Sequence, residues 1–269
     1  MVQSAWWAEC VPGSARLRWI GRSLAGGRVV LALAIVAGGA ARAGELSLAT
    51  GLEYTSGKYG DSAASTSWYL PLVARYEQGP LIFRATLPYL RNTGAVSRTP
   101  DGVAIPGTGG SQEGFGDIVL AAGATLWSAS DFSVDGVAKL KLPTADPGKE
   151  LGTGKTDWSM QFDGVQRVGP VSVLATLGWK KYGDPDGVDF RNPLFASLGF
   201  SWRLSAVTSV GLYHDWRERL RPRGSEVSET TAYVSVRLDP TWKLQLYGVK
   251  GFSDASPDYG AGLMVSRIY

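Results

Sequence analysis

The 269-residue chain has few of the residues that carry enzyme and metal chemistry. It contains one cysteine, Cys10, and one histidine, His214. Because Cys10 falls in the segment that we expect to be removed on export, the mature protein can form no disulfide and can use no thiolate chemistry. The sequence also lacks an apolar run of the roughly 20 residues that a membrane-spanning helix needs.

The first 43 residues have the layout of a secretory signal peptide. A short apolar segment, residues 29–38 (VVLALAIVAG), follows several arginines and precedes the small-x-small sequence Ala41-Arg42-Ala43. This order of basic region, apolar region and cleavage site is typical of an export leader. We therefore expect residues 1–43 to be removed and residues 44–269 to form one mature domain.

The basic charge of the chain comes from this leader. The whole sequence has 27 Lys and Arg against 24 Asp and Glu, and residues 1–43 hold five of the former and one of the latter, which leaves 22 against 23. A mature chain so close to neutral carries no electrostatic signal for nucleic acid.

The mature sequence alternates apolar residues with small or polar ones. In residues 46–54, Leu46, Leu48 and Leu52 share one parity, and Gly51 and Glu53 share the other. A period of two indicates a strand with one apolar face. The same alternation predicts twelve strands, with the other eleven at 67–77, 81–91, 116–127, 132–142, 157–168, 171–181, 193–203, 206–217, 229–238, 242–252 and 258–269.

The connections between these strands alternate in length. Tight turns are expected at 78–80, 169–170 and 239–241, and long polar loops at 94–114 and 143–155. This alternation is typical of an outer-membrane β-barrel with both chain ends on the short-turn, periplasmic side. Strands of about 10–12 residues are long enough to cross a bilayer at a tilt.

Aromatic residues support the same prediction. Six tryptophans lie near strand ends, as an interfacial belt requires: Trp68, Trp158, Trp179, Trp202, Trp216 and Trp242. The last strand ends on Tyr269, which is similar to the signal by which the barrel-insertion machinery recognises its clients. A soluble β-sandwich or lipocalin-like barrel also alternates, but its second face would be rich in charge rather than in Gly, Ala and Ser. We therefore predict an all-β, transmembrane, antiparallel up-and-down barrel.

Two motifs with apparent chemistry do not fit their usual context. The GTGKT segment, residues 152–156, resembles a phosphate-binding loop, but Lys149 stands where that loop needs its first glycine, and a predicted strand follows instead of a helix. The carboxylates of the DPDGVD segment, residues 184–189, could hold calcium weakly, but a polar turn, or a bridge to neighbouring lipopolysaccharide through divalent ions, explains them better. We expect no cofactor and no metal.

His214 is the one candidate for hydrolytic catalysis. A serine hydrolase would need a serine and an orienting acid beside it, for which Ser209, Asp215 and Glu218 are the nearby candidates. Ser209 has the opposite parity and should face the other side of the strand. We therefore assign no catalytic residue, and a serine from another strand stays open.

The small and polar parity should face the lumen. Its charges of both signs could pair across the interior or line a wet path, and a twelve-stranded barrel leaves room for a narrow pore only. The candidate lumen-facing residues of the solute path are Arg75, Arg84, Asp117, Lys139, Lys141, Gln161, Asp163, Lys180 and Arg237.

Several segments resemble the outer-membrane barrel family named after the meta-pathway of phenol degradation. The matching segments, in chain order, are LPY at 87–89, GFGD at 114–117, KLPTAD at 141–146, LGTG at 151–154 with Asp157, GDP at 183–185, GVD at 187–189 and RN at 191–192. Ala145 replaces a glycine common in the family. The resemblance covers about residues 46–269 and implies a Gram-negative outer-membrane protein that passes small hydrophobic or aromatic compounds, with no catalytic residues to transfer.

The expected function is thus passive passage of a small solute through the outer membrane, with outer-membrane lipid, lipopolysaccharide and the insertion machinery as partners and no nucleic acid. Two other hypotheses stay open: a lipid hydrolase or deacylase centred on His214, and a non-conducting structural barrel plugged by ion pairs. The sequence does not decide whether the loop at residues 92–113 folds into the barrel.

Overall fold

The computed structural model describes residues 44–269, and the predicted signal peptide lies outside them. Its long strands are β1 (Glu45–Gly57), β2 (Ser65–Gln78), β3 (Leu81–Thr93), β7 (Ile118–Ser128), β8 (Phe132–Leu142), β9 (Asp157–Val168), β10 (Val171–Lys181), β11 (Leu194–Arg203), β12 (Thr208–Arg217), β13 (Val227–Arg237), β14 (Trp242–Gly251) and β15 (Tyr259–Ile268). Three short strands belong to the loop after β3: β4 (Val96–Arg98), β5 (Ala104–Pro106) and β6 (Ser111–Phe115).

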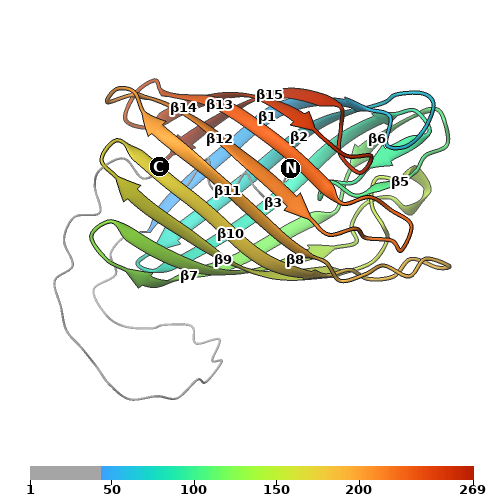
Figure 1. Ribbon diagram of the computed structural model, residues 1–269, viewed down its shortest axis with the longest axis horizontal. Helices are drawn as coiled ribbons and strands as arrows, with labels where there is room; N and C mark the ends of the chain where they lie inside the picture. The colour runs from blue at the N-terminus through green and yellow to red at the C-terminus, as the bar shows by residue number, and fades with distance from the viewer. Residues whose placement is uncertain (1–43) are drawn as a thin grey trace, which may run out of the picture.

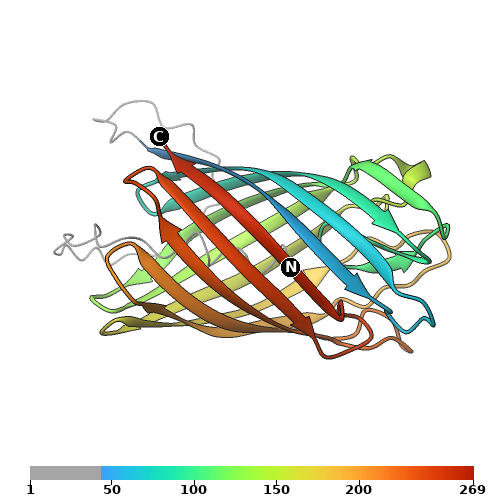
Figure 2. The ribbon, with the colours of Figure 1, turned by 90° about the horizontal axis from the view of Figure 1, so that it is seen from above.

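The long strands form one closed antiparallel barrel. Each pairs with its neighbours along the chain, β1 pairs with β15, and β2 pairs with β3 to complete the ring. The tilt of the strands against the long axis is visible in Figure 1, and Figure 2 shows β1 and β15 side by side. This confirms the predicted twelve-stranded up-and-down barrel. None of the described residues forms a helix that is long and apolar enough to cross a membrane.

The apolar side chains point outward. On β1, Leu46, Leu48 and Leu52 are 38%, 43% and 41% exposed, whereas Glu53 and Thr55 on the alternate parity are 7% and 1% exposed. A soluble barrel would show the opposite burial, so this surface matches one that faces lipid hydrocarbon.

Short turns and long loops lie at opposite ends of the barrel (Figure 1). The described chain starts and finishes together at the short-turn end, where the backbone N–H of Tyr269 donates to the carbonyl of Leu46 at 2.8 Å. All long loops, including the 3₁₀ turn η1 (Pro147–Lys149), therefore gather at the other end.

The strand expected at 116–127 differs from the structure at its beginning. β6 and β7 are two halves of one barrel strand, and both pair with β3. The ladder is interrupted at Gly116 and Asp117 because the Gly116 N–H donates to the Pro88 carbonyl at 2.9 Å and Asp117 Oδ1 accepts from the Ala145 N–H at 3.1 Å. At this interruption the carboxylate of Asp117 is fully buried, next to Lys141 on β8.

Glycines make room for aromatic rings on the inner wall. A Cβ on Gly211 would lie 2.4 Å from Tyr233 Cζ, and one on Gly262 would lie 2.5 Å from Tyr247 Cζ, so each ring lies flat over a glycine of the neighbouring strand. Gly178 and Phe195 are paired across strands in the same way, and Gly199 is paired with Tyr213, whose Cβ would lie 2.5 Å from a Cβ on the glycine. Such glycine–aromatic pairs stabilise a sheet where a glycine alone would weaken it.

Candidate functional site

The loop after β3 folds into the lumen. Its two short strands, β4 and β5, form a hairpin with a turn at residues 99–103, in which the Thr99 N–H donates to the Val103 carbonyl at 3.0 Å. Gly102 has φ of +74° there, a conformation that glycine adopts without strain. Thr99, Asp101 and Val103 are all at most 6% exposed. The sequence left the position of the loop at 92–113 undecided; its hairpin enters the barrel with residues 97–103 buried, and residues 108–110 stay exposed.

Two ion pairs fasten the hairpin to the far wall. Arg98 Nη2 lies 3.1 Å from Glu229 Oε1 on β13, and both side chains are almost fully buried. Asp101 pairs with Lys180 on β10 and accepts a further hydrogen bond from Thr99 Oγ1 at 2.6 Å. β10 and β13 both lie several strands away from β3 around the ring. The hairpin thus crosses the lumen.

A chain of buried ion pairs continues from Lys180 along the wall. Lys180 Nζ lies 3.4 Å from Asp157 Oδ2, and the same oxygen lies 2.9 Å from Lys141 Nζ. Lys141 Nζ also lies 3.3 Å from Asp117 Oδ2. With Asp101, these groups form what we call the lumen ion chain: Asp101, Lys180, Asp157, Lys141 and Asp117. Its charges alternate in sign, which compensates for their removal from water.

The lumen ion chain explains why separate motifs occur together in the sequence. Asp117 belongs to GFGD, Lys141 to KLPTAD, and Asp157 follows LGTG. The LGTG segment itself packs on the chain: a Cβ on Gly152 would lie 2.5 Å from Asp117 Oδ2, and Lys141 Nζ donates to Thr153 Oγ1 at 2.7 Å. These motifs therefore close the loop end of the charged wall rather than bind a nucleotide.

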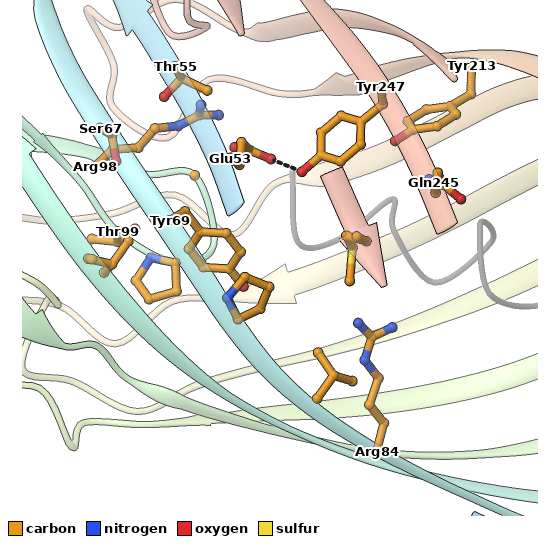
Figure 3. Close-up of a pocket in the computed structure, with 16 residues that line it drawn as sticks. Glu53, Thr55, Ser67, Tyr69, Arg84, Arg98, Thr99, Tyr213, Gln245 and Tyr247 are labelled. Atoms are coloured by element: carbon orange, nitrogen blue, oxygen red, sulfur yellow. Dashed lines mark hydrogen bonds between the residues drawn. The ribbon is translucent and has the colours of Figure 1, made fainter. Parts of the chain in front are cut away.

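An aromatic cavity lies on the other side of the hairpin. It encloses about 730 Å³, part of it open to solvent, between the hairpin turn and strands β1, β2, β3, β12, β14 and β15. Tyr69, Tyr213 and Tyr247 border it together with Pro71, Pro100 and Met264 (Figure 3). Tyr247 Oη donates to Glu53 Oε2 at 2.8 Å, which fixes the direction of that ring. Glu53, Arg84 and Arg98 also line the cavity, and its tyrosine rings offer flat apolar surface to a planar solute.

Two further cavities border the same hairpin turn. One, of about 530 Å³, is lined by Asp101 and by the charged residues of β3 and β8–β10, among them Arg84, Lys139 and Lys141. The other, of about 500 Å³, lies against β10–β13 beside Arg98, Asp215 and Arg217. The hairpin thus divides the lumen into an aromatic side and a charged side.

The charges of the hairpin are set by their partners. Burial by itself would raise the pKa of Asp101, but the ammonium groups of Lys180 and Lys141 and the hydrogen bonds from Lys180 and Thr99 hold it well below its usual range. Burial opposes the charge of Arg98, yet Tyr59, Glu229 and Glu53 raise its pKa further. Both hairpin groups are therefore ionised at neutral pH, and both ion pairs are in place.

Most of the predicted path residues lie on the inner wall near the hairpin. Arg75, Arg84, Asp117, Lys141, Gln161, Asp163 and Lys180 are at most 9% exposed. Lys139 is half-buried and lines the charged cavity. Arg237 differs: it is exposed at the short-turn end of β13 and borders none of the three cavities.

His214 lies on the outer face of β12, away from the lumen. Its Nδ1 lies 2.9 Å from Thr230 Oγ1, and its Nε2 lies 3.4 Å from Ser228 Oγ. Both partners come from β13. Among the described residues no carboxylate contacts the ring, and Glu218 instead accepts from the Leu194 N–H at 2.8 Å. The nearby acids that the sequence offered do not orient the imidazole.

The carboxylates of residues 184–189 do not converge. Asp184 Oδ1 accepts from the Phe190 N–H at 2.9 Å, and Asp186 pairs with Lys155 at 3.0 Å. No group of three potential metal ligands occurs in the described part of the chain. These side chains shape the loop between β10 and β11.

Sequence reasoning missed the hairpin residues Arg98 and Asp101 and the inward tyrosines. Tyr213, Tyr233 and Tyr247 occupy the parity that otherwise holds small or polar residues, and each faces a glycine on one adjacent strand. Large aromatics on the small-residue parity were the available signal. The hairpin had no comparable signal, because its partners lie 131 and 79 residues away in sequence.

No protein-family model and no curated protein matches the chain in sequence. Solved structures do match. An outer-membrane channel from Pseudomonas putida F1 is 16% identical, with a TM-score of 0.64 over 87% of this chain and 100% of that one. The KdgM porin is 11% identical, with a TM-score of 0.52 over 82% and 98%. The KdgM porin in complex with disordered oligogalacturonate scores 0.52 at 9% identity, over 83% and 98%. The chain therefore has the fold of outer-membrane β-barrels.

Proposed function

We propose that the protein is a passive outer-membrane channel for small apolar or aromatic solutes and that it has no enzymatic role. The observation that carries the proposal is the aromatic cavity, in which tyrosine rings, prolines and a methionine, together with three charged side chains, line open space beside a hairpin that narrows the lumen. A solute with a flat apolar surface contacts these rings favourably, whereas a hydrated ion gains little from them.

The proposed orientation follows the same logic. The short-turn end faces the periplasm after the leader, residues 1–43, is removed, and the long loops face outward. The last strand, β15, and Tyr269 after it carry the insertion signal, and the apolar outer face contacts membrane lipid. The resemblance to the family named after the meta-pathway of phenol degradation supports the solute class, because that family implies passage of small hydrophobic or aromatic compounds.

Single-channel recording in planar bilayers tests the proposal. We expect steady currents from the wild type and reversible current block by a neutral monosubstituted benzene, with little block by glucose. Tyr69→Ala should weaken the block because it removes a ring from the inner face of β2. Tyr76→Ala removes an exposed tyrosine from the outer face of the same strand and serves as the matched control. Currents no higher than those of protein-free bilayers would reject a channel.

A lipid hydrolase is the second candidate, and the 3.4 Å contact between His214 Nε2 and Ser228 Oγ favours it. The two groups lie on the outer face, where an ester of a membrane lipid could reach them. A neutral Thr230 hydroxyl stands where a carboxylate usually orients the imidazole. Release of fatty acid from phospholipid by the wild type and its loss in His214→Ala would establish this activity, and equal release by both would remove it.

The third candidate, a non-conducting structural barrel, rests on the ion pairs that tie the hairpin across the lumen. Steady single-channel currents in the recording above would contradict it.

A further inference from the structure

Basic side chains on the inner wall lie in one row across the strands. Those of β2 and β3 are direct register partners, and small residues on β7 and β9, Ala121 and Ser159, connect β3 to β8 and β8 to β10. The members of this basic row, in order from β2 to β10, are Arg75, Arg84, Lys139 and Lys180. Because like charges on neighbouring positions destabilise a sheet, the row gains from negative charge beside it.

The basic row rises along the barrel because the strands are tilted against its long axis (Figure 1). Arg84 is the fourth residue of β3 after a short turn, whereas Lys180 is the last residue but one of β10, before a long loop. At the lower end of the row, Arg75 contacts Glu77 at 2.8 Å. From Arg84 onward the row thus runs toward the loop end of the lumen, and a negatively charged solute would meet positive side chains along this line.

A row of carboxylates runs parallel to the basic row. Its members, joined by register pairs from β8 to β13, are Asp135, Asp163, Asp215 and Glu229, with Thr176 and Ser197 between the second and the third. On β8 the neutral Val137 separates the two rows. Asp215 and Glu229 line the cavity of about 500 Å³, whereas Arg84 and Lys139 line the charged cavity of about 530 Å³. The two rows therefore border different cavities.

The wall of the charged cavity carries more positive than negative side chains. Its basic residues are Arg84, Lys139, Lys141 and Lys180, and its acidic residues are Asp101 and Asp157. Each of these two carboxylates contacts a lysine of the lumen ion chain. Two further acids, Asp117 and Asp163, are buried in the wall, where Lys141 contacts the former and Thr176 donates to the latter at 2.9 Å. The cavity therefore presents a predominantly positive surface to a solute.

Arg84 borders two cavities at once. Its side chain lines the charged cavity and also the aromatic cavity, which Tyr69 and Tyr247 border. In Figure 3 the Arg84 guanidinium points into the aromatic cavity, and Glu53 lies on its far side, where the carboxylate accepts from Tyr247. The planar guanidinium group offers paired donors that match the two oxygens of a carboxylate. A carboxylate-binding group and aromatic surface therefore face the same open space.

We propose that the solute of this channel is an aromatic carboxylate, whose ring lies against Tyr69 and Tyr247 while its carboxylate binds Arg84. Lys139 and Lys180 extend the positive wall from this site toward the loops. The inference rests on the proposed channel function and narrows its solute class. A neutral aromatic compound would use the rings alone, and a small aliphatic anion would use the basic row alone. A flat ring that carries a negative group uses both.

Block of single-channel potassium chloride currents by benzoate and by benzyl alcohol at neutral pH tests the inference, because the two compounds share a ring and differ in charge. In the wild type, benzoate should block at about tenfold lower concentration, the effect of one hydrogen-bonded charge. Arg84→Gln should remove this advantage and leave block by benzyl alcohol unchanged. Tyr69→Ala should weaken block by both compounds. Arg203→Gln removes the same charge at the exposed end of β11, outside the three cavities, and should behave like the wild type.

Equal blocking concentrations of benzoate and benzyl alcohol in the wild type would overturn this inference and leave the channel function standing. The same loss of benzoate block in Arg203→Gln as in Arg84→Gln would also overturn it, as would block by acetate as strong as block by benzoate. Steady currents that neither aromatic compound blocks would remove the aromatic path itself. Folding of each variant is checked by heat-modifiable mobility. Lys139→Gln, which should also weaken block by benzoate alone, provides the comparison if Arg84→Gln does not fold.

Discussion

The two sides of the lumen are built from different chemistry. On the charged side, Lys141 and Asp157 are 3% and 0% exposed and belong to a continuous chain of ion pairs. On the aromatic side, Tyr69 and Tyr247 remain partly exposed and border open space. Buried ions need partners in contact, so the ion chain holds the charged side rigidly around its cavities, whereas rings lying on glycines leave a smooth apolar surface beside the open space. The charged side therefore holds the hairpin, and the aromatic side offers the path.

Removing the hairpin should abolish this division and produce the largest effect. Replacement of residues 96–106 by a short Gly-Ser linker takes the turn and both of its ion pairs out of the lumen. Because the hairpin borders all three cavities, single-channel conductance should rise about threefold or more in a twelve-stranded barrel. An unchanged conductance would mean that the hairpin does not limit the path.

Removing a cation from the lumen ion chain should lower the free energy of unfolding strongly and change solute passage little. In Lys141→Met, Asp117 and Asp157 lose a buried cation. Leaving a buried charge uncompensated typically costs about 3–5 kcal/mol, which urea unfolding in lipid vesicles would detect. Tyr69→Ala, on the aromatic side, should lose far less stability. Similar losses for both variants would contradict the assignment of different roles to the two sides.

Narrowing the aromatic cavity should change the passage of an aromatic solute strongly and change the free energy of unfolding little. In Gly262→Ala the new Cβ would lie 2.5 Å from Tyr247 Cζ, which pushes the ring into the cavity and away from Glu53. The residence time of an aromatic blocker should change by about twofold to tenfold, the effect of roughly 0.5–1.5 kcal/mol in aromatic contact. Gly248→Ala, on the outer face, is the matched control because its Cβ meets open space.

Moderate acidification should have the smallest effect. The pKa of Asp101 is lowered in the fold, so its contribution is complete above the ordinary value of about 3.9 and is lost only as pH falls through the lower folded value. Conductance set by the hairpin should therefore be constant between about pH 5 and pH 8. A stepwise opening near pH 6 that persists in Asp101→Asn would point to another group as the determinant.

The sequence predicted the strands better than the lumen. The boundaries of β8, β9 and β10 agree with the alternation, since each strand carries its own apolar parity. The start of β7 differs because Gly116 bonds to Pro88 and Asp117 to Ala145, contacts that the local pattern does not contain. Arg237 shares the inward parity of β13 but lies at the exposed end of the strand. Parity predicts which face of the barrel a residue lies on, but not how far along the barrel axis it lies.

The sequence by itself determined that this chain forms a closed barrel with an apolar outside, because a period of two is a local property that each strand expresses without reference to the others. Only the tertiary structure decided that the hairpin turn at residues 99–103 lies in the lumen, that Arg98 meets Glu229, and that Asp101 meets Lys180. The hairpin lies in the lumen because Arg98 and Asp101 are paired there with charges on β13 and β10. Those strands become neighbours of the hairpin only after the barrel has closed.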